Sequence, residues 1–526
     1  MAEKIYLYDS TLRDGAQTEG VDFTYSDKQD ITWKLEELGI DYIEGGWPGA
    51  NPTDDEFFAS LPKLKKSRIT AFGMTRRPST TAKNDPGLAA LLNSGVKAVC
   101  LVGKSWDFHV TKALNTTLKE NLSMISESIE HVVKKGCETI FDAEHFFDGY
   151  KANPEYALKA VMAAYEAGAR WVVLCDTNGG SLPHEIEEII KEVTVHVPGD
   201  HLGIHCHNDT DNAVANSLAA VRAGVRHVQG TLNGVGERCG NANLISIIPT
   251  LVLKMGFKTN ISKSGLKHLT KISHFLDEKL NKAPNQFAPY VGSSAFAHKG
   301  GLHVSAVLKS PESYEHIEPE LIGNMRKILV SNQAGRSNIV ARLKEAGFDV
   351  DEVSKSKITA LVAEVKQLES QGYSYDTADA SFVVLAHKML NDMQDFFRLK
   401  SFRVIDERRW NAKGKLITVS EAIVKMDIDG HELMTVAQGK GPVNALDQSL
   451  RKALSDKYPQ LSDLRLIDYK VRIINSGVGT EAITRVLIES EDGKGNRWTT
   501  VGVSANIIDA SYNALRDSIT YRLMRK

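Results

Sequence analysis

Two histidines separated by one residue are the clearest chemical feature of this sequence. His205 and His207 belong to an apolar, strand-like run that begins at Leu202. Residues i and i+2 of a β-strand project to the same side, so the two imidazoles can bind one metal ion together. Two polar histidines at a strand end without a ligand are the alternative, and the pair alone does not decide between these readings.

Eight short apolar runs are typical of buried strands and include the one that carries the two histidines. Between Lys4 and about Gly256 they alternate with amphipathic stretches, several of which end at a glycine, as helices often do. The expected strands are Ile5–Asp9, Tyr42–Gly46, Arg68–Phe72, Ala98–Val102, Thr139–Glu144, Trp171–Asp176, Leu202–His207 and His227–Leu232. Eight strand–helix units within about 250 residues predict an α/β fold, the (β/α)8 or TIM barrel. An open doubly wound sheet is the alternative, but its glycine-rich first turn is absent after Asp9.

Polar residues follow several of the expected strands. The chain places Asp14 after the first strand, Glu44 at the end of the second, Glu144 at the end of the fifth and Thr177 after the sixth. In a parallel barrel these strand ends meet at one rim. Two imidazoles and a carboxylate suit Zn, Mn, Fe, Co or Mg, and Asp14 is the best candidate for the third ligand. With Arg13 beside it, such a site stabilises an enolate or alkoxide, as an aldol or Claisen reaction requires.

The composition is that of an ordinary soluble globular protein. The 526 residues are 42% hydrophobic and 25% charged, with a net charge of −2, which gives no support for a nucleic-acid or anionic-membrane partner. The N-terminus shows no signal-peptide pattern, and no apolar run reaches the ~18 residues of a membrane span. Five scattered cysteines favour a reducing, cytoplasmic location over a disulfide framework.

The sequence predicts three regions. Residues 1–265 form the barrel, 266–398 a mainly helical linker and 399–526 a separate α+β domain. In the linker, helices are expected at 266–280, 357–371 and 381–397. In the last region, strands are expected at 404–406, 422–427, 464–474 and 482–490, and helices at 442–457 and 505–523.

Three motifs of the barrel region occur together. They are Asp9-Ser-Thr-Leu-Arg-Asp-Gly-Ala-Gln17, His205-Cys-His207 and Gly234-Val-Gly-Glu-Arg-Cys-Gly-Asn241. Together they resemble the metal-dependent acyl-CoA Claisen-condensing barrel family, which includes 2-isopropylmalate, homocitrate and citramalate synthases and, as a cousin, hydroxymethylglutaryl-CoA lyase. The stretches Ala437–Ala445, Gly479-Thr480 and Asp509–Ser511 resemble the regulatory domain of that family.

Two details resemble the citramalate synthase branch most. They are Gly15-Ala16-Gln17 and Glu44-Gly-Gly-Trp-Pro-Gly49. The resemblance implies an acyltransferase that condenses acetyl-CoA with pyruvate and water to (R)-citramalate and CoA, in isoleucine biosynthesis. The alternative is 2-isopropylmalate synthase activity, with 2-oxoisovalerate as the acceptor in leucine biosynthesis. A retro-aldol lyase is disfavoured, because a lyase of that kind needs no C-terminal sensor domain.

The resemblance also implies ligands for a divalent metal ion, which is Mn, Mg, Zn or Co. Asp14, His205 and His207 are the implied ligands, and Asn241 is a fourth, directly or through water. Arg13 is implied to polarise the keto carbonyl and to hold the developing alkoxide.

Three further rim residues have implied roles and simpler alternatives. Thr177 is implied to bind the keto-acid carboxylate, Glu44 to organise Arg13, and Glu144 to help deprotonate the acetyl methyl group. The alternatives are a helix cap for Thr177, a structural carboxylate for Glu44 and a pair with a nearby cation for Glu144.

The segment Ala297–His303 resembles the one that supplies a catalytic histidine in the family. The resemblance therefore implies a catalytic role for His303, with Tyr314 as its partner. In the family this segment reaches the active site of the neighbouring subunit, which implies a homodimer or a higher homo-oligomer. The regulatory domain implies an amino-acid effector, for which isoleucine is the expected compound. Surface positions for His298 and His303 are the alternative.

Overall fold

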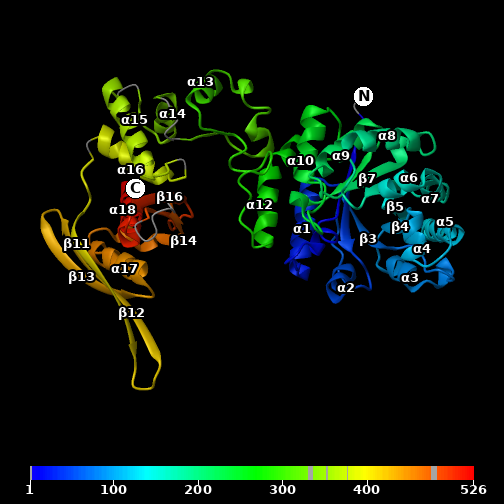
Figure 1. The fold of residues 1–526 in the computed structure, drawn as a ribbon, viewed down its shortest axis with the longest axis horizontal. Helices are drawn as coiled ribbons and strands as arrows, with labels where there is room; N and C mark the ends of the chain where they lie inside the picture. The colour runs from blue at the N-terminus through cyan, green and yellow to red at the C-terminus, as the bar shows by residue number, and fades with distance from the viewer. Residues whose placement is uncertain are drawn as a thin grey trace. The chain divides into compact units, whose positions relative to one another are not determined.

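Figure 1 shows the chain in a computed structural model that describes residues 3–329, 336–350, 353–375, 377–391, 393–474 and 482–525. The chain forms two compact units, Met1–Phe296 with Ile317–Met325, and Ala297–His316 with Arg326–Lys526. The domain boundary expected after residue 398 falls inside the second unit. The regulatory motif at Gly479-Thr480 lies outside the described residues.

The first unit is built around a closed barrel of eight parallel strands, which confirms the predicted (β/α)8 fold. The strands neighbour one another in chain order, and β1 pairs with β8 to close the barrel. They are β1 (Tyr6–Asp9), β2 (Tyr42–Gly46), β3 (Arg68–Met74), β4 (Ala98–Lys104), β5 (Glu138–Glu144), β6 (Trp171–Asp176), β7 (Leu202–Cys206) and β8 (His227–Gly230). Strands of this kind are covered by side chains on the inside and by helices on the outside, which explains their nearly continuous apolar sequences.

The helices around the barrel begin where the sequence supplies a cap. Thr24 and Asp27 form a capping box at the start of α1, and Asn51 and Asp85 accept a backbone hydrogen bond just before the prolines that open α2 and α3. The larger helices of this unit are α1 (Tyr25–Leu38), α2 (Pro52–Ala59), α3 (Pro86–Asn93), α5 (Leu118–Lys134), α6 (Phe146–Ala152), α7 (Pro154–Glu166), α8 (Pro183–Thr194), α9 (Ala213–Arg222) and α12 (Leu269–Lys279). The shorter helical segments include α4 (Asp107–Lys112), α10 (Leu244–Pro249), a π-helical turn (Thr250–Lys254) and α11 (Lys263–Leu266). The helix expected at 266–280 is confirmed as α12, which begins three residues later than expected.

The second unit combines helices with two antiparallel three-stranded sheets. Its helices are α13 (Gly301–Lys309), α14 (Arg336–Glu345), α15 (Lys355–Ser370), α16 (Asp379–Leu390), α17 (Pro442–Leu454) and α18 (Ile507–Met524). One sheet is β11 (Arg398–Trp410), β12 (Leu416–Ile428) and β13 (His431–Gly439), and the other is β14 (Arg465–Ile473), β15 (Thr484–Glu491) and β16 (Arg497–Ser504). A two-residue pairing, β9 (Ala297–His298) with β10 (Lys327–Ile328), lies near α13 in the chain.

Some strands of the second unit were not expected from the sequence, namely β13, β16 and the short pair β9 and β10. β11 and β12 are longer than expected, each with thirteen residues rather than three and six. The side chains of β13 are mostly exposed, so the strand lacks the alternation of apolar and polar residues by which a half-buried strand is recognised.

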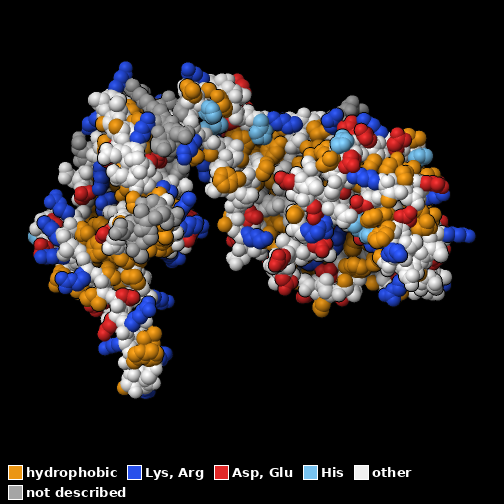
Figure 2. Space-filling view, viewed as in Figure 1, with side chains coloured by type: hydrophobic (Ala, Val, Ile, Leu, Met, Phe, Trp, Pro, Cys, Tyr) orange, Lys and Arg blue, Asp and Glu red, His pale blue; other side chains and the backbone are white. Residues whose placement is uncertain are grey.

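Charge is spread over the surface. Lys, Arg, Asp and Glu side chains are interspersed over the visible face of the barrel unit (Figure 2). None of the helices in the described part of the chain has the length and apolar character needed to cross a membrane.

Candidate metal centre and active site

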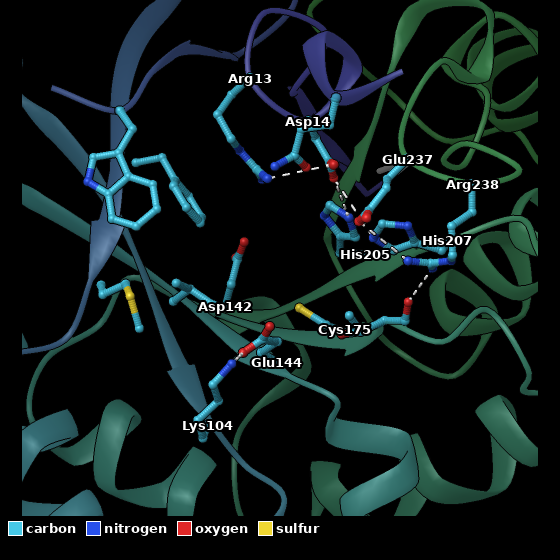
Figure 3. A pocket seen from close by; sticks show the side chains of 16 residues that line it. Arg13, Asp14, Lys104, Asp142, Glu144, Cys175, His205, His207, Glu237 and Arg238 are labelled. Atoms are coloured by element: carbon cyan, nitrogen blue, oxygen red, sulfur yellow. Dashed lines mark hydrogen bonds and ion pairs between the residues drawn. The ribbon is translucent and has the colours of Figure 1, made fainter. Parts of the chain in front are cut away.

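Three of the predicted metal ligands meet at the carboxyl ends of the barrel strands (Figure 3). Asp14, His205 and His207 are buried, and one ligand atom of each lies within 4.8 Å of the others. The Nε2 atoms of His205 and His207 lie 3.2 Å and 3.9 Å from Oδ2 of Asp14. β7 ends at Cys206, one residue earlier than expected, and His207 continues it as an isolated bridge to Asn241.

The donor set fits a divalent metal ion. Two imidazole nitrogens and a carboxylate oxygen are a common ligand set for Zn, Mn, Fe or Co, and the site has open positions for a substrate. Asn241 provides a further observation. Its Nδ2 donates to the carbonyl of Val235, whereas its buried Oδ1 accepts no hydrogen bond from the described residues. An orphaned acceptor beside the two histidines is what a further oxygen ligand requires.

A glutamine inside the barrel orients His205. Nδ1 of His205 lies 2.7 Å from Oε1 of Gln229, and Nε2 of Gln229 donates to Asp142 at 2.9 Å. An amide oxygen only accepts, so Nδ1 of His205 carries a proton and its Nε2 faces Asp14. This is the arrangement that fixes the tautomer of a metal-binding histidine.

The electrostatics of the three side chains favour a bound cation. Burial raises the pKa of Asp14, but Arg13, His205 and His207 outweigh it and hold the pKa well below the ordinary value. Burial and repulsion from His205 lower the pKa of His207 to about 3, so this imidazole stays neutral, as a ligand must be. Burial opposes protonation of His205 too, but the hydrogen bond to Asp14 raises its pKa to about 9. The group therefore attracts one positive charge.

Arg13 is fixed on two sides. Its Nε donates to Oε2 of Glu44 at 2.8 Å, and its NH1 lies 3.7 Å from Asp14. The guanidinium carbon lies 4.1 Å from the centre of the Phe72 ring, a cation–π contact. Glu44 is fully buried and also accepts a hydrogen bond from the hydroxyl of Tyr8 at 2.7 Å. Glu44 therefore organises Arg13 in this structure, and the remaining guanidinium N–H groups are left for a ligand.

Glu144 and Thr177 line the same cavity, which has a volume of about 280 Å³. Glu144 forms an ion pair with Lys104, and both side chains line the cavity. A pair with a nearby cation was the alternative expected for Glu144. Oγ1 of Thr177 accepts a hydrogen bond from the backbone of His145 at 2.8 Å, so its own proton points elsewhere. Thr177 does not cap a helix, because the helix that follows begins at Pro183.

Several residues that line this cavity received no role from the sequence, among them Phe72, Met74, Val102 and Lys104. Gln229, which orients His205, received none either. Trp47, Phe72, Met74 and Val102 form an apolar wall of the cavity. The alternation Cys100, Val102, Lys104 along β4 was the available signal, because it directs every second side chain of the strand into the barrel.

His303 and Tyr314 belong to the second unit, and the structure brings their rings together at a centroid distance of 4.4 Å. Both side chains are exposed. His298 is held differently. Its Nε2 lies 3.1 Å from Oε1 of Glu315, a buried carboxylate that also pairs with Arg326 at 2.6 Å. Of the two histidines in this segment, His298 is the one oriented by a carboxylate.

Family models match three successive parts of the chain. The HMGL-like model matches residues 4–275, the homocitrate synthase post-HMGL domain-like model residues 290–373, and the LeuA allosteric (dimerisation) domain model residues 376–523.

Relatives match over almost the whole length. The chain is 54% identical to a protein of Aquifex aeolicus (strain VF5) named (R)-citramalate synthase, covering 100% of this chain and 99% of that one. It is 51% identical to a protein of the same name in Geobacter sulfurreducens, covering 99% and 97%. A 2-isopropylmalate synthase of Methanocaldococcus jannaschii is 31% identical, covering 100% and 96%. The chain therefore belongs to the HMGL-like family, in the branch whose members are named (R)-citramalate synthase.

Proposed function

We propose that this protein is an (R)-citramalate synthase, which condenses acetyl-CoA with pyruvate and water to give (R)-citramalate and CoA. The observation that carries the proposal is the identity of 45–54% with five proteins of that name over nearly the full length. Proteins named 2-isopropylmalate synthase match at 30–31%, so this alternative has less support. Citramalate is a precursor of isoleucine, and we propose that the enzyme acts in isoleucine biosynthesis.

The cavity supplies the groups that a Claisen condensation needs. Asp14, His205 and His207, with Asn241, would hold a divalent cation (Mn, Mg, Zn or Co), which supplies Lewis acidity toward the 2-oxo acid. Arg13 donates hydrogen bonds to the keto oxygen and neutralises the charge that develops there as the new carbon–carbon bond forms.

Two other side chains act on the substrates. The free hydroxyl proton of Thr177 binds the carboxylate of the 2-oxo acid, because its oxygen already accepts from His145. Glu144 takes a proton from the acetyl methyl group, which makes that carbon the nucleophile.

The apolar wall of Trp47, Phe72, Met74 and Val102 receives the side chain of the 2-oxo acid. Because Trp47, Phe72 and Met74 are bulky, this wall favours the methyl group of pyruvate over the branched side chain of 2-oxoisovalerate. Each methylene changes the free energy of discrimination by only about 1–3 kcal/mol, so preference and not absolute exclusion is expected.

The segment 297–316 supplies a histidine to the reaction. His303, with Tyr314, is the residue implied by the family resemblance, and the contact with Glu315 supports His298 as the second choice. A histidine that is oriented by a hydrogen bond to a buried carboxylate is well placed to act as a general acid or base.

The C-terminal region makes the enzyme a homodimer or a higher homo-oligomer and binds an amino-acid effector, for which isoleucine is our choice. The matched model is described as a LeuA allosteric (dimerisation) domain. Exposed apolar side chains on the β11–β13 sheet support an interface, and they include Ile405, Trp410, Leu433, Met434 and Val436. Hydrophobic side chains gather near the tip of the β11–β12 hairpin in Figure 2. Such surfaces on a sheet mark interaction sites.

Truncation is a poor test of regulation. Ser381 of α16 hydrogen-bonds Asp517 of α18 and the backbone of Val501, so removal of the residues after 398 exposes the buried face of α16. Inhibition of the full-length enzyme by a panel of amino acids is the better measurement. We expect isoleucine to inhibit most strongly, and indifference to every amino acid would contradict an effector site.

A thiol-release assay with acetyl-CoA and a panel of 2-oxo acids tests the function. We expect pyruvate to give the highest kcat/KM, with citramalate identified as the product by chromatography. Exhaustive chelation should abolish the release of CoA, and Mn²⁺ should restore it. A preference for 2-oxoisovalerate would favour 2-isopropylmalate synthase, and full activity after chelation would remove the metal from the mechanism.

A further inference from the structure

A lysine on β4 faces the metal cavity and has no role in the mechanism proposed above. Lys104 is the last residue of β4 and stands level with Glu144, because the register of the two strands pairs these positions. Residues paired across parallel strands point to the same side of the sheet. Both side chains line the cavity, and they form an ion pair there (Figure 3).

Lys104 differs from the other two cationic side chains that line the described cavity. Arg13 is bound by Glu44 and lies beside Asp14. Arg238 makes two hydrogen bonds to Asp209, at 2.7 Å and 3.0 Å, and a third to the carbonyl of Thr177. Lys104 is partnered by the carboxylate that takes the methyl proton, so its partner loses its charge during the reaction.

A thioester methyl group is a weak acid, and a base alone does not make its deprotonation fast. The negative charge moves onto the thioester carbonyl oxygen, and a donor aimed at that oxygen lowers the barrier. Arg13 and the metal ligands, to which the proposed mechanism assigns the keto acid, lie on the other side of the cavity from Glu144 in Figure 3. The oxygen of the thioester needs a donor next to the base.

We propose that Lys104 is a catalytic residue whose ammonium group donates a hydrogen bond to the carbonyl oxygen of the acyl thioester as the enolate forms. This role rests on the proposed function, because it needs an acyl thioester as a substrate.

The step balances in atoms and charge. A methyl C–H bond breaks, its proton passes to the Glu144 carboxylate, and the electron pair forms the C=C bond of the enolate. One negative charge thereby moves from Glu144 to the thioester oxygen. Lys104 loses its anionic partner at the moment when a new anion forms, so its charge is compensated before and after the transfer. Attack of the enolate on the keto carbon then restores the thioester carbonyl.

The full-length enzyme with Lys104→Met tests the proposal, since methionine keeps the length of the side chain without its charge. Loss of a single oxyanion donor lowers turnover by about 10²–10³-fold, and we expect a fall of this size in kcat/KM for acetyl-CoA. The primary isotope effect with trideuterated acetyl-CoA should increase, because proton abstraction becomes fully rate-limiting. Metal content and pyruvate affinity, measured by calorimetry, should stay within twofold of the wild type.

Three variants complete the experiment. Lys104→Arg keeps a cation and should recover part of the lost rate, and Lys104→Gln replaces the methionine variant if that protein does not fold. Lys191→Met is the matched control, because Lys191 pairs with Glu187 on the surface of α8 and should leave all readouts unchanged.

Two outcomes would overturn the role of Lys104. One is a fall of less than tenfold in kcat/KM for Lys104→Met, and the other is a large fall without an increase in the isotope effect. A wild-type enzyme that releases CoA with none of the 2-oxo acids would instead refute the proposed function, so the two failures are distinguishable.

Discussion

Replacing Gln229 should weaken metal binding without removing a ligand. Gln229 is fully buried in the barrel and joins His205 to Asp142 through hydrogen bonds of 2.7 Å and 2.9 Å. Gln229→Met keeps the volume nearly constant but offers neither the acceptor for Nδ1 of His205 nor the donor for Asp142. The imidazole loses the contact that directs its Nε2 toward Asp14.

The magnitude can be derived in two ways. Loss of a partner that orients a ligand typically lowers metal affinity by about 10–100-fold, or about 1.4–2.7 kcal/mol. A buried N–H group without an acceptor costs about 1–3 kcal/mol, and Nδ1–H of His205 becomes such a group in the variant. The two ranges agree, so we expect the dissociation constant for Mn²⁺ to rise by about 10–100-fold.

Calorimetric titration of the metal-free enzyme with Mn²⁺ measures this change. Gln438→Met is the control, because it makes the same substitution at an exposed position of β13. A dissociation constant for Gln229→Met within twofold of the wild type would refute the reasoning, as would an equal weakening in the control.

Three further predictions concern other parts of the structure. Arg13→Lys should lower kcat by about 10²–10³-fold with normal metal content, because a lysine cannot bind Glu44 and a keto oxygen at once, and near-normal turnover would remove Arg13 from catalysis. His298→Ala should lower kcat more than His303→Ala if orientation by Glu315 marks the catalytic histidine, whereas the opposite order would return the role to His303. Burial, together with repulsion from Arg170 and His205, lowers the pKa of His227 to about 3, so the folded enzyme cannot take up the proton that the unfolded chain binds below its ordinary pKa of about 6.5. The free energy of unfolding therefore falls by about 2 kcal/mol between pH 7.5 and pH 5. Urea unfolding at these pH values should show a smaller fall for His227→Phe, by about that amount. The same pH dependence in the variant and the wild type would contradict this prediction.

The barrel and the positions of its strands could be predicted because each strand is buried on both faces. Continuous apolar runs such as Trp171–Cys175 need only local information to be recognised, and the glycines that follow the helices mark the connections. The same reasoning brought Asp14, His205 and Glu144 to one rim, since the carboxyl ends of parallel strands coincide. The structure brings these three side chains together.

Other parts depend on facts that no local pattern carries. Lys104 ends the apolar strand β4 and Gln229 lies within β8, and the register between neighbouring strands sets the partners of both. His298 and His303 cannot be ranked without Glu315, which lies more than ten residues later and folds back onto His298. The strand β13 is mostly exposed, and only its last five residues alternate between half-buried and exposed positions.

The polar side chains of the barrel interior form one connected network, which ties the metal ligands to the arginine. Hydrogen bonds and ion pairs run in the order Asp142, Gln229, His205, Asp14, Arg13, Glu44, Tyr8 and Thr70. Burial raises the pKa of two carboxylates in this network, Asp142 and Glu44. His205 and Arg13 oppose the rise at Asp142, and Arg13 opposes it at Glu44. Each buried charge in this network is therefore stabilised by the side chain next to it. Removal of one side chain leaves its neighbour in the network without a partner. Gln229 and Glu44 lie on opposite sides of the metal ligands and do not touch. The effects of substituting them on the free energy of unfolding should nevertheless be non-additive, because both residues belong to this network.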